Sequence, residues 1–380
     1  MINNLILFIA FVFIVYDPWF FQTLRGFILG SIITLAFFFV RKKYTIQISN
    51  LNLLLIIAVF LAISLLPAII HYTFDFSVFL MYLRTLIYSI LLFILYLAIP
   101  KKDTFIYFLK LSLYFQFLVI ILCVLAPSAF KNFIFNVHTV ESFFYGSEQE
   151  YRLYIFTSMA FFQLSLFFGF VFNFLLNLYL EKKINLAPIL VCFICGMISG
   201  RSFLIFAAIS IFISGFNFKL IISVLIAAMA IYFIAVNFQD NIYVYHALEP
   251  IINYINDKGL QSSSSDNLIN NMLIWPSDKQ ILVGDGMYTN EDKSYYMHTD
   301  SGYLRQIFYG GILYLLLCLI LTIYIVKRVS TNWFQSKKIK FFISSMLIFS
   351  IGHVKADVFM YPGITLFLLL LLAFYPKDEK

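Results

Sequence analysis

Four side chains capable of acid–base or ionic chemistry lie within eight residues, where a polar stretch of the chain meets a long apolar one. They are His298, Asp300, Tyr303 and Arg305. An imidazole and a carboxylate both accept protons, so His298 and Asp300 are the candidate general base and its orienting partner. Tyr303 offers a phenol for substrate contact, and Arg305 offers a fork of donors that matches phosphate oxygens. The stretch therefore predicts chemistry on a phosphorylated substrate at the boundary between water and an apolar phase.

An ordinary structural role accounts for part of this stretch. Asp300 or Ser301 is a good N-cap for a helix that begins near Gly302. Capping does not account for Arg305, which would lie about 7 Å below the start of the helix. An isolated guanidinium at that depth is costly, whereas one that faces a phosphate is favourable. The unpaired N–H groups of the helix N-terminus would favour the same anion.

The composition predicts that these residues belong to a membrane protein. Of the 380 residues, 62% are hydrophobic and 12% charged, and the mean hydropathy is +0.92. Soluble domains carry about 25% charged residues. The expected fold is therefore all-α, a polytopic integral membrane protein with about twelve transmembrane helices. The expected spans are residues 2–16, 24–40, 51–70, 81–99, 104–126, 153–180, 184–199, 202–216, 220–236, 303–326, 339–351 and 358–374.

The chain is expected to form a single transmembrane domain over residues 1–380, with a long external loop or cap at residues 237–299, between the ninth and tenth spans. Every second connection carries basic residues, for example Lys101 with Lys102 and Lys182 with Lys183. Basic residues are enriched in cytoplasmic loops, so this pattern predicts that both termini are cytoplasmic and that the long loop lies on the other side of the membrane.

Several basic residues nevertheless fall on the side where this rule predicts few of them. They are Arg25, Arg84, Arg152, Arg201, Arg305 and Lys355. Arg201 is the most informative, because it lies at the tip between two spans of only about 15 residues, short of the roughly 20 needed to cross a bilayer. A recessed arginine there suits an anion in a cavity open to the exterior, and the alternative is a side chain that snorkels to the headgroups. Lys355 lies at a similar tip, where a local ion pair with Asp357 is the alternative.

The two best-placed cations predict a reaction class. Arg201 and Arg305 together would clamp a diphosphate, with Arg152, Arg84 and Lys355 as further candidates. Cations that stabilise a departing diphosphate, with a base that activates an incoming hydroxyl, predict glycosyl transfer from a lipid-linked sugar. A nucleotide-sugar donor is not expected, because the cytoplasmic connections are too short to form a domain and no glycine-rich phosphate loop is present.

No metal, other cofactor or nucleic acid is expected. Cys192 and Cys195 have the spacing of a metal motif, but they lie in apolar sequence without a second pair, which favours helix packing. The long loop lacks the ligand spacing of a zinc or calcium site. The remaining imidazoles and nearby acids outside the spans are expected to be ordinary loop residues: His71, Asp75, His138, Glu141 and His246.

Four motifs carry a resemblance to a known family. They are the tip Ser199-Gly200-Arg201-Ser202, the turn at residues 283–286, the stretch at residues 298–303, and the pair Gly310 and Gly311. In these motifs and in nearly its whole predicted topology, the chain resembles the bacterial O-antigen polymerase (Wzy) family, which is related to the O-antigen ligases. The resemblance implies a fold similar to the multi-helical, lipid-dependent glycosyltransferases of the GT-C type, without nucleotide or metal.

The resemblance also implies a reaction and a location. The enzyme would act at the periplasmic face of the bacterial inner membrane, moving a growing glycan from undecaprenyl diphosphate onto a new lipid-linked repeat unit. Arg201 and Arg305 would engage the diphosphate, and His298 with Asp300 would lie at the acceptor. The expected partners are the lipid-linked oligosaccharide as donor and acceptor, the bilayer, a chain-length regulator and a flippase.

Two alternatives remain open. An O-antigen ligase would share the cationic site but transfer the glycan to the lipid A core. A flippase for lipid-linked oligosaccharides would also have about twelve spans and internal cations. Transporters usually show paired repeats, and the two halves of this sequence show no convincing similarity.

Overall fold

The structure is a computed structural model that describes residues 2–21, 23–40, 48–125, 128–139, 144–259, 266, 270, 272–358 and 363–377. The described chain is almost entirely helical. Its named strands are the two-residue β1 (Trp19–Phe20) and β2 (Leu24–Arg25), which pair antiparallel. The all-α class predicted from the composition is thus confirmed.

Each of the twelve predicted spans overlaps a helix. These helices are α1 (Ile2–Tyr16), α2 (Gly26–Val40), α3 (Ile48–Ile63) followed by α4 (Leu66–Ile70), α5 (Ser77–Ala98), α6 (Lys102–Leu125), α8 (Phe161–Leu180), α9 (Ala187–Ser199), α10 (Ser202–Ser214), α11 (Phe218–Asn237), α15 (Gly302–Trp333), α16 (Lys338–Lys355) and α17 (Ile364–Phe374). The shorter elements between them are α7 (Ser128–Phe135), η2 (Glu150–Leu153), α12 (Ile242–Ile255), α14 (Asp278–Val283) and η4 (Tyr296–His298).

Six helical stretches in the described residues are long and apolar enough to cross a membrane. They are the stretch Asn50–Ile70, which contains most of α3 and all of α4, and the helices α5, α6, α8, α11 and α15. Five further apolar helices, α1, α2, α9, α10 and α17, are shorter. The structure therefore supports a membrane protein that crosses the bilayer several times.

Helix α8 forms the core of the bundle, with every residue from 164 to 178 buried. It packs against α9, α10, α16 and α17. A helix that is apolar on all sides is stable only when other helices surround it. Its two asparagines bridge to neighbouring helices, because Asn173 donates to the Ser345 hydroxyl (2.9 Å) and Asn177 donates to the Ser214 hydroxyl (2.9 Å).

The predicted span at residues 153–180 is wrong in its first part, because α8 begins only at Phe161. The preceding segment is irregular but buried, and other elements satisfy its backbone. The Gln116 side chain accepts from the Phe156 N–H (2.8 Å) and donates to the Phe156 carbonyl (3.1 Å). The Thr157 hydroxyl donates to the Tyr16 carbonyl at the end of α1 (2.5 Å). Irregular backbone is tolerated among spanning helices when protein groups satisfy it in this way.

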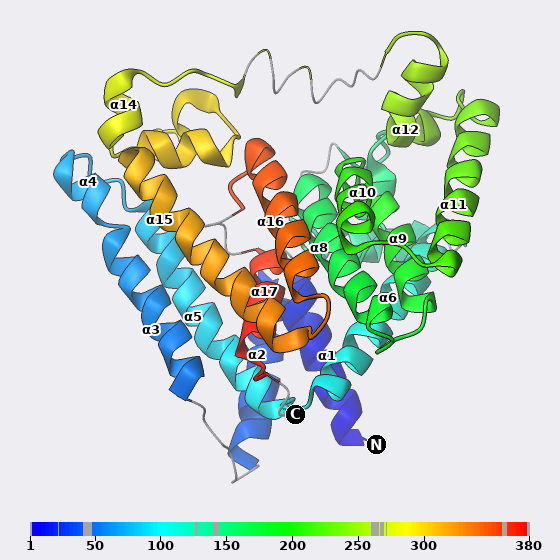
Figure 1. The fold of residues 1–380 in the computed structure, drawn as a ribbon, viewed down its shortest axis with the longest axis horizontal. Helices are drawn as coiled ribbons and strands as arrows, with labels where there is room; N and C mark the ends of the chain where they lie inside the picture. Colours follow the sequence, from blue (N-terminus) through cyan, green and yellow to red (C-terminus); the bar gives the residue numbers. More distant parts are fainter. Residues whose placement is uncertain are drawn as a thin grey trace.

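The two chain termini lie at the same end of the bundle (Figure 1). Helices α12 and α14, the start of α15 and the end of α16 lie at the opposite end. The elements that carry the candidate residues therefore gather at the end away from the termini.

Candidate functional site

Arg305 lies in the first turn of α15 and is buried, with 5% of its surface exposed. Its guanidinium lies between two aromatic rings, 4.0 Å from the ring centroid of Tyr288 and 3.6 Å from that of Tyr295. Within the described residues, no carboxylate forms an ion pair with Arg305, and its Nε atom has no hydrogen-bond partner. Aromatic faces therefore hold this cation, and its N–H groups remain available for an anionic ligand.

A buried carboxylate holds one of these rings in place. Tyr288 is 1% exposed, and its hydroxyl donates to the carboxylate of Asp357. The same carboxylate accepts a hydrogen bond from the Gln306 side chain (2.6 Å) and lies 3.8 Å from Nδ1 of His353. Asp357 therefore joins the loop before α15, α15 itself and α16. This role goes beyond the local ion pair with Lys355 that the sequence offers as an alternative.

Two glycine motifs set the path of the loop that carries Tyr288. The Asp285 N–H donates to the Phe308 carbonyl (2.6 Å), and the Gly286 N–H donates to the Tyr309 carbonyl (3.0 Å). These carbonyls lie where α15 is kinked at Gly310 and Gly311, the latter with φ of 71°.

The contact between the motifs leaves no space for side chains. A Cβ atom on Gly284 would lie 2.7 Å from the Gly310 nitrogen, and one on Gly311 would lie 2.4 Å from the Leu282 carbonyl oxygen. The motifs at residues 283–286 and 310–311, which are distant in the sequence, thus form one backbone-to-backbone contact.

The segment between α4 and α5 braces the same loop. Asp75 accepts from the N–H groups of Tyr288 (2.7 Å) and Thr289 (2.9 Å). Burial raises the pKa of Asp75, but hydrogen bonds from Ser77, Tyr288 and Thr289 outweigh it and lower the pKa overall. Nε2 of His71 lies 3.0 Å from the Val283 carbonyl oxygen. As predicted from the sequence, His71 and Asp75 are loop residues, and they support the position of Tyr288.

Arg152 and the α9–α10 tip lie side by side. Arg152 is buried in η2, where its guanidinium contacts the ring of Phe161 (5.7 Å to the centroid) and donates to Gln149 (3.3 Å). A Cβ atom on Gly200 would lie 4.0 Å from the guanidinium carbon of Arg152. The next residue, Arg201, forms an ion pair with Glu249 of α12, and each side chain is 14% exposed.

Lys355 and Asp300 connect these two groups of cations. The charges of Arg201, Arg152 and Asp300 all act on the ammonium of Lys355, at the end of α16. The charges of Arg305 and Lys355 both act on the carboxylate of Asp300. We call Arg152, Arg201, Arg305 and Lys355 the basic cluster. Five of the predicted site residues thus gather at the end of the bundle opposite the termini.

Burial raises the pKa of the Asp300 carboxyl, although the charges of Arg305 and Lys355 oppose the rise. A carboxylate with a raised pKa takes up a proton more readily than an ordinary aspartate does. Such a group suits general base catalysis near the cluster.

The other predicted site residues lie elsewhere. His298 is exposed at the end of η4 with φ of 54°, and within the described chain no hydrogen bond or ion pair joins it to Asp300. Arg84 is exposed on α5. Tyr303 is half-buried, and its ring packs edge-on against that of His353, with centroids 4.6 Å apart.

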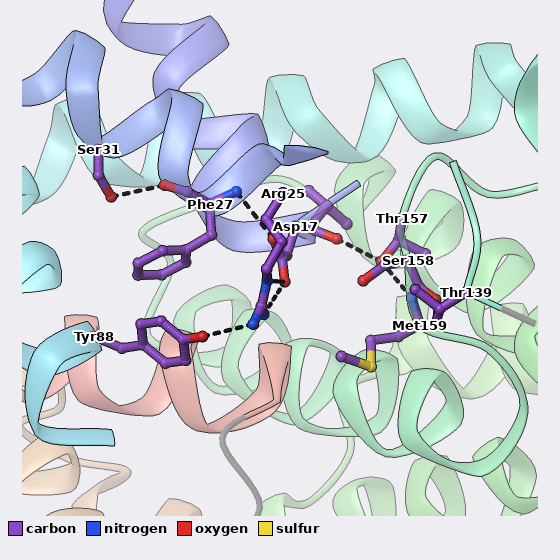
Figure 2. Close-up of polar contacts among 10 residues, drawn as sticks. Asp17, Arg25, Phe27, Ser31, Tyr88, Thr139, Thr157, Ser158 and Met159 are labelled. Carbon is purple, nitrogen blue, oxygen red and sulfur yellow. Dashed lines mark hydrogen bonds and ion pairs between the residues drawn. The ribbon is translucent and has the colours of Figure 1, made fainter. Parts of the chain in front are cut away.

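Arg25 is committed to a structural ion pair, as Figure 2 shows. Its guanidinium donates to the buried carboxylate of Asp17 and to the Tyr88 hydroxyl (2.6 Å). Asp17 also accepts from the Phe27 N–H (2.9 Å). These contacts join α1, α2 and α5, so topology and packing explain this cation without a ligand.

The histidines His138 and His246 lie against neutral hydrogen-bond partners. His138 is buried, and its Nε2 lies 2.8 Å from the Leu153 carbonyl oxygen. Within the described chain it forms no ion pair, and burial lowers its pKa to about 4. Glu141 lies outside the described residues. His246 lies on α12 with Nδ1 3.3 Å from the Tyr151 hydroxyl. Cys192 and Cys195 are buried in α9, and the searched residues contain no group of three or more possible metal ligands.

Sequence reasoning missed Tyr288, Glu249 and Asp357 as parts of the site. Asp357 gave one usable signal, since an acid beside an apolar span requires a partner. Tyr288 and Glu249 lie in a long loop with several tyrosines and acids, and nothing in the pattern distinguishes them from their neighbours.

A small apolar pocket lies next to this network. Its wall includes Val358, which follows Asp357 directly, and Tyr82 from α5. The remaining lining comes from α3, α5, α15, α16 and α17: Ile57, Thr85, Leu321, Thr322, Ile325, Phe349, Thr365, Leu366, Leu369 and Leu370.

Comparisons with protein-family models, curated proteins and solved structures give no match to this chain. The function must therefore be inferred from the residues and their arrangement.

Proposed function

We propose that this chain is a glycosyltransferase that joins lipid-diphosphate-linked oligosaccharide repeat units into a surface polysaccharide, as an O-antigen polymerase does. The observation that carries the proposal is the basic cluster, in which two buried cations, Arg152 and Arg305, and two half-buried ones, Arg201 and Lys355, come from four separate parts of the chain. Like charges repel strongly in a medium of low dielectric constant, so a shared polyanionic ligand would stabilise the arrangement.

The pairing of the cations favours a diphosphate. Arg201 pairs directly with Glu249, and the charges of Arg305 and Lys355 act on Asp300, whereas neither Arg305 nor Arg152 forms an ion pair within the described chain. A diphosphate joined to a sugar and a lipid carries about two negative charges. Arg305 and Arg152 hold their guanidinium groups mainly against aromatic rings and neutral acceptors, so they are the best placed to bind its oxygens.

The reaction follows from these positions. Asp300 takes the proton from an acceptor sugar hydroxyl, whose oxygen then forms a bond to the anomeric carbon of the donor. The bond between that carbon and the diphosphate oxygen breaks, and the diphosphate leaves with the electron pair. The basic cluster stabilises the negative charge that develops on it. Tyr303 contacts the substrate, and His298 belongs to the acceptor side of the loop.

The membrane setting completes the proposal. Twelve spans, cytoplasmic termini and an active site at the periplasmic face of the bacterial inner membrane fit the basic connections and the common end of the two termini (Figure 1). The similarity to GT-C type enzymes is part of the same proposal.

The test is a reaction with pure components. The purified protein in proteoliposomes receives defined undecaprenyl-diphosphate-linked repeat units, and the products are separated by length. A ladder of long polymer supports the proposal. Transfer only onto added lipid A core indicates a ligase, and movement of repeat units across the bilayer without any polymer indicates a transporter.

A further inference from the structure

We propose that Glu249 determines which anions the basic cluster accepts, by occupying Arg201 until a diphosphate displaces it. The inference rests on the proposed function, because it concerns the ligand of the same site. It assigns a specificity role to a residue of α12 that does not take part in the chemistry.

The contacts of α12 place Glu249 at the entrance of the cluster. Its carboxylate pairs with Arg201 at the α9–α10 tip. One turn earlier, Nδ1 of His246 lies 3.3 Å from the hydroxyl of Tyr151, the neighbour of Arg152. Both contacts fasten the same face of α12 over the two arginines.

The turn that carries Glu249 is not a regular helix. Leu248 has non-helical angles (φ −114°, ψ 18°), and Pro250 lies inside α12 without an N–H group to donate. Glu249 lies at this kink, between Leu248 and Pro250. Because Pro250 cannot donate to a carbonyl of the preceding turn, that turn lacks one of its helical hydrogen bonds.

The rest of α12 is only loosely attached. Its buried apolar contacts form a small cluster apart from the main core, built on Ala235, Leu248 and Ile252. Segments with so few buried contacts move at low cost in free energy.

Electrostatics then explain why a diphosphate would displace Glu249. A ligand with a single phosphate group gains little when it replaces the Glu249 carboxylate at Arg201. A diphosphate can bridge Arg201 to the charges of Arg152 and Lys355, which lie together. Arg201 is either paired with Glu249 or released from it, and a ligand favours the released state only if it binds that state more tightly. An anion that bridges several cations has this extra affinity.

The experiment measures binding to the full-length protein in lipid nanodiscs. The two probes are undecaprenyl diphosphate and undecaprenyl monophosphate, and the quantity is the ratio of their dissociation constants. We expect Glu249→Gln to bind the monophosphate about tenfold more tightly than the wild type does. The gain in affinity for the diphosphate should be smaller, so the ratio of the two dissociation constants moves closer to one. Glu249→Asp keeps the charge and should keep most of the discrimination.

Two controls separate this effect from a general change of charge or fold. Glu148 lies near His246 and, within the described chain, forms no ion pair with Arg201, so Glu148→Gln should leave the ratio within about twofold of the wild type. In an Arg201→Gln background, Glu249→Gln should have no further effect. Unchanged discrimination in Glu249→Gln, with an unaltered thermal transition, would overturn the inference.

The polymerisation reaction separates the two proposals. If the wild type makes polymer while Glu249→Gln discriminates as before, the role of Glu249 is wrong and the proposed function stands. If Glu249→Gln loses discrimination but the wild type makes no polymer, the basic cluster binds a diphosphate under the control of Glu249, and the glycosyltransferase proposal is wrong.

Discussion

The guanidinium of Arg305 lies over the ring of Tyr288, 4.0 Å from its centroid. The Tyr288 hydroxyl in turn donates to the buried carboxylate of Asp357. The arginine therefore has a carboxylate nearby in its network without pairing with it, which keeps the guanidinium charged and open to an external anion. An aromatic ring can hold a cation in place without neutralising it.

The hydrogen bond between Tyr288 and Asp357 should contribute to stability. Tyr288→Phe keeps the ring beneath Arg305 but leaves Asp357 with one donor fewer, and we expect a loss of about 1–3 kcal/mol in the free energy of unfolding. The Tyr314 hydroxyl is buried and has no hydrogen-bond partner within the described residues, so Tyr314→Phe is the matched control. It should be neutral or slightly stabilising. Thermal unfolding of the two variants in detergent checks this, and equal losses would contradict the role of the Asp357 contact.

The contact between the two glycine motifs predicts an intolerance to side chains. Gly311→Ala adds a Cβ atom 2.4 Å from the Leu282 carbonyl oxygen at φ of 71°, and we expect a loss of about 3 kcal/mol or more in stability together with loss of activity. Gly259 has a similar φ of 78° with nothing within 4 Å, so Gly259→Ala should cost only about 1 kcal/mol. Unfolding midpoints of the two variants test the difference. Similar costs would show that backbone strain, rather than the contact, accounts for the effect.

The pKa of Asp300 predicts how the reaction depends on pH. The raised pKa means that Asp300 becomes protonated, and is lost as a base, at a higher pH than an ordinary aspartate. The polymerisation rate should therefore fall as the pH is lowered through this raised pKa, and Asp300→Asn should abolish activity at every pH.

A second variant tests the cause of that pKa. The charge of Arg305 lowers the pKa of Asp300, so Arg305→Lys, which keeps the charge, should leave the acid limb of the pH profile close to its original position. Arg305→Gln removes the charge and should raise the pKa of Asp300, which infrared titration of its carboxyl group measures without turnover. An Asp300 pKa that stays in place in Arg305→Gln would contradict the electrostatic link between these residues.

The sequence predicts the helices better than it predicts the site. Long apolar segments have few alternatives to a helix in a membrane, so all twelve predicted spans overlap helices. The first part of one span, residues 153–160, is irregular, and Gln116 on another helix satisfies its backbone. Topology also singled out Arg201, Arg305, Arg152 and Lys355, because basic residues on that side of the membrane require an explanation. Arg84 and Arg25 gave the same signal, although one is exposed on α5 and the other pairs with Asp17.

Long-range pairing is the part that the sequence could not supply. Helices α10 and α11 separate Arg201 from Glu249 in the sequence, and 26 residues separate Gly284 from Gly311. No local pattern encodes such contacts. The same holds for Tyr288 and Asp357. The residue type of His298 and its position two residues before Asp300 predict a shared site, but the backbone turns at η4 and leaves His298 exposed.

The central claim is that the basic cluster stabilises a departing lipid diphosphate. Its most direct test is polymer length from undecaprenyl-diphosphate-linked repeat units, made by purified wild type, Arg305→Ala, Arg201→Ala and, as a control on α6, Lys110→Ala. We predict long polymer from the wild type and from Lys110→Ala, and none from either arginine variant at equal amounts of folded protein. Full-length polymer from both arginine variants would contradict the claim.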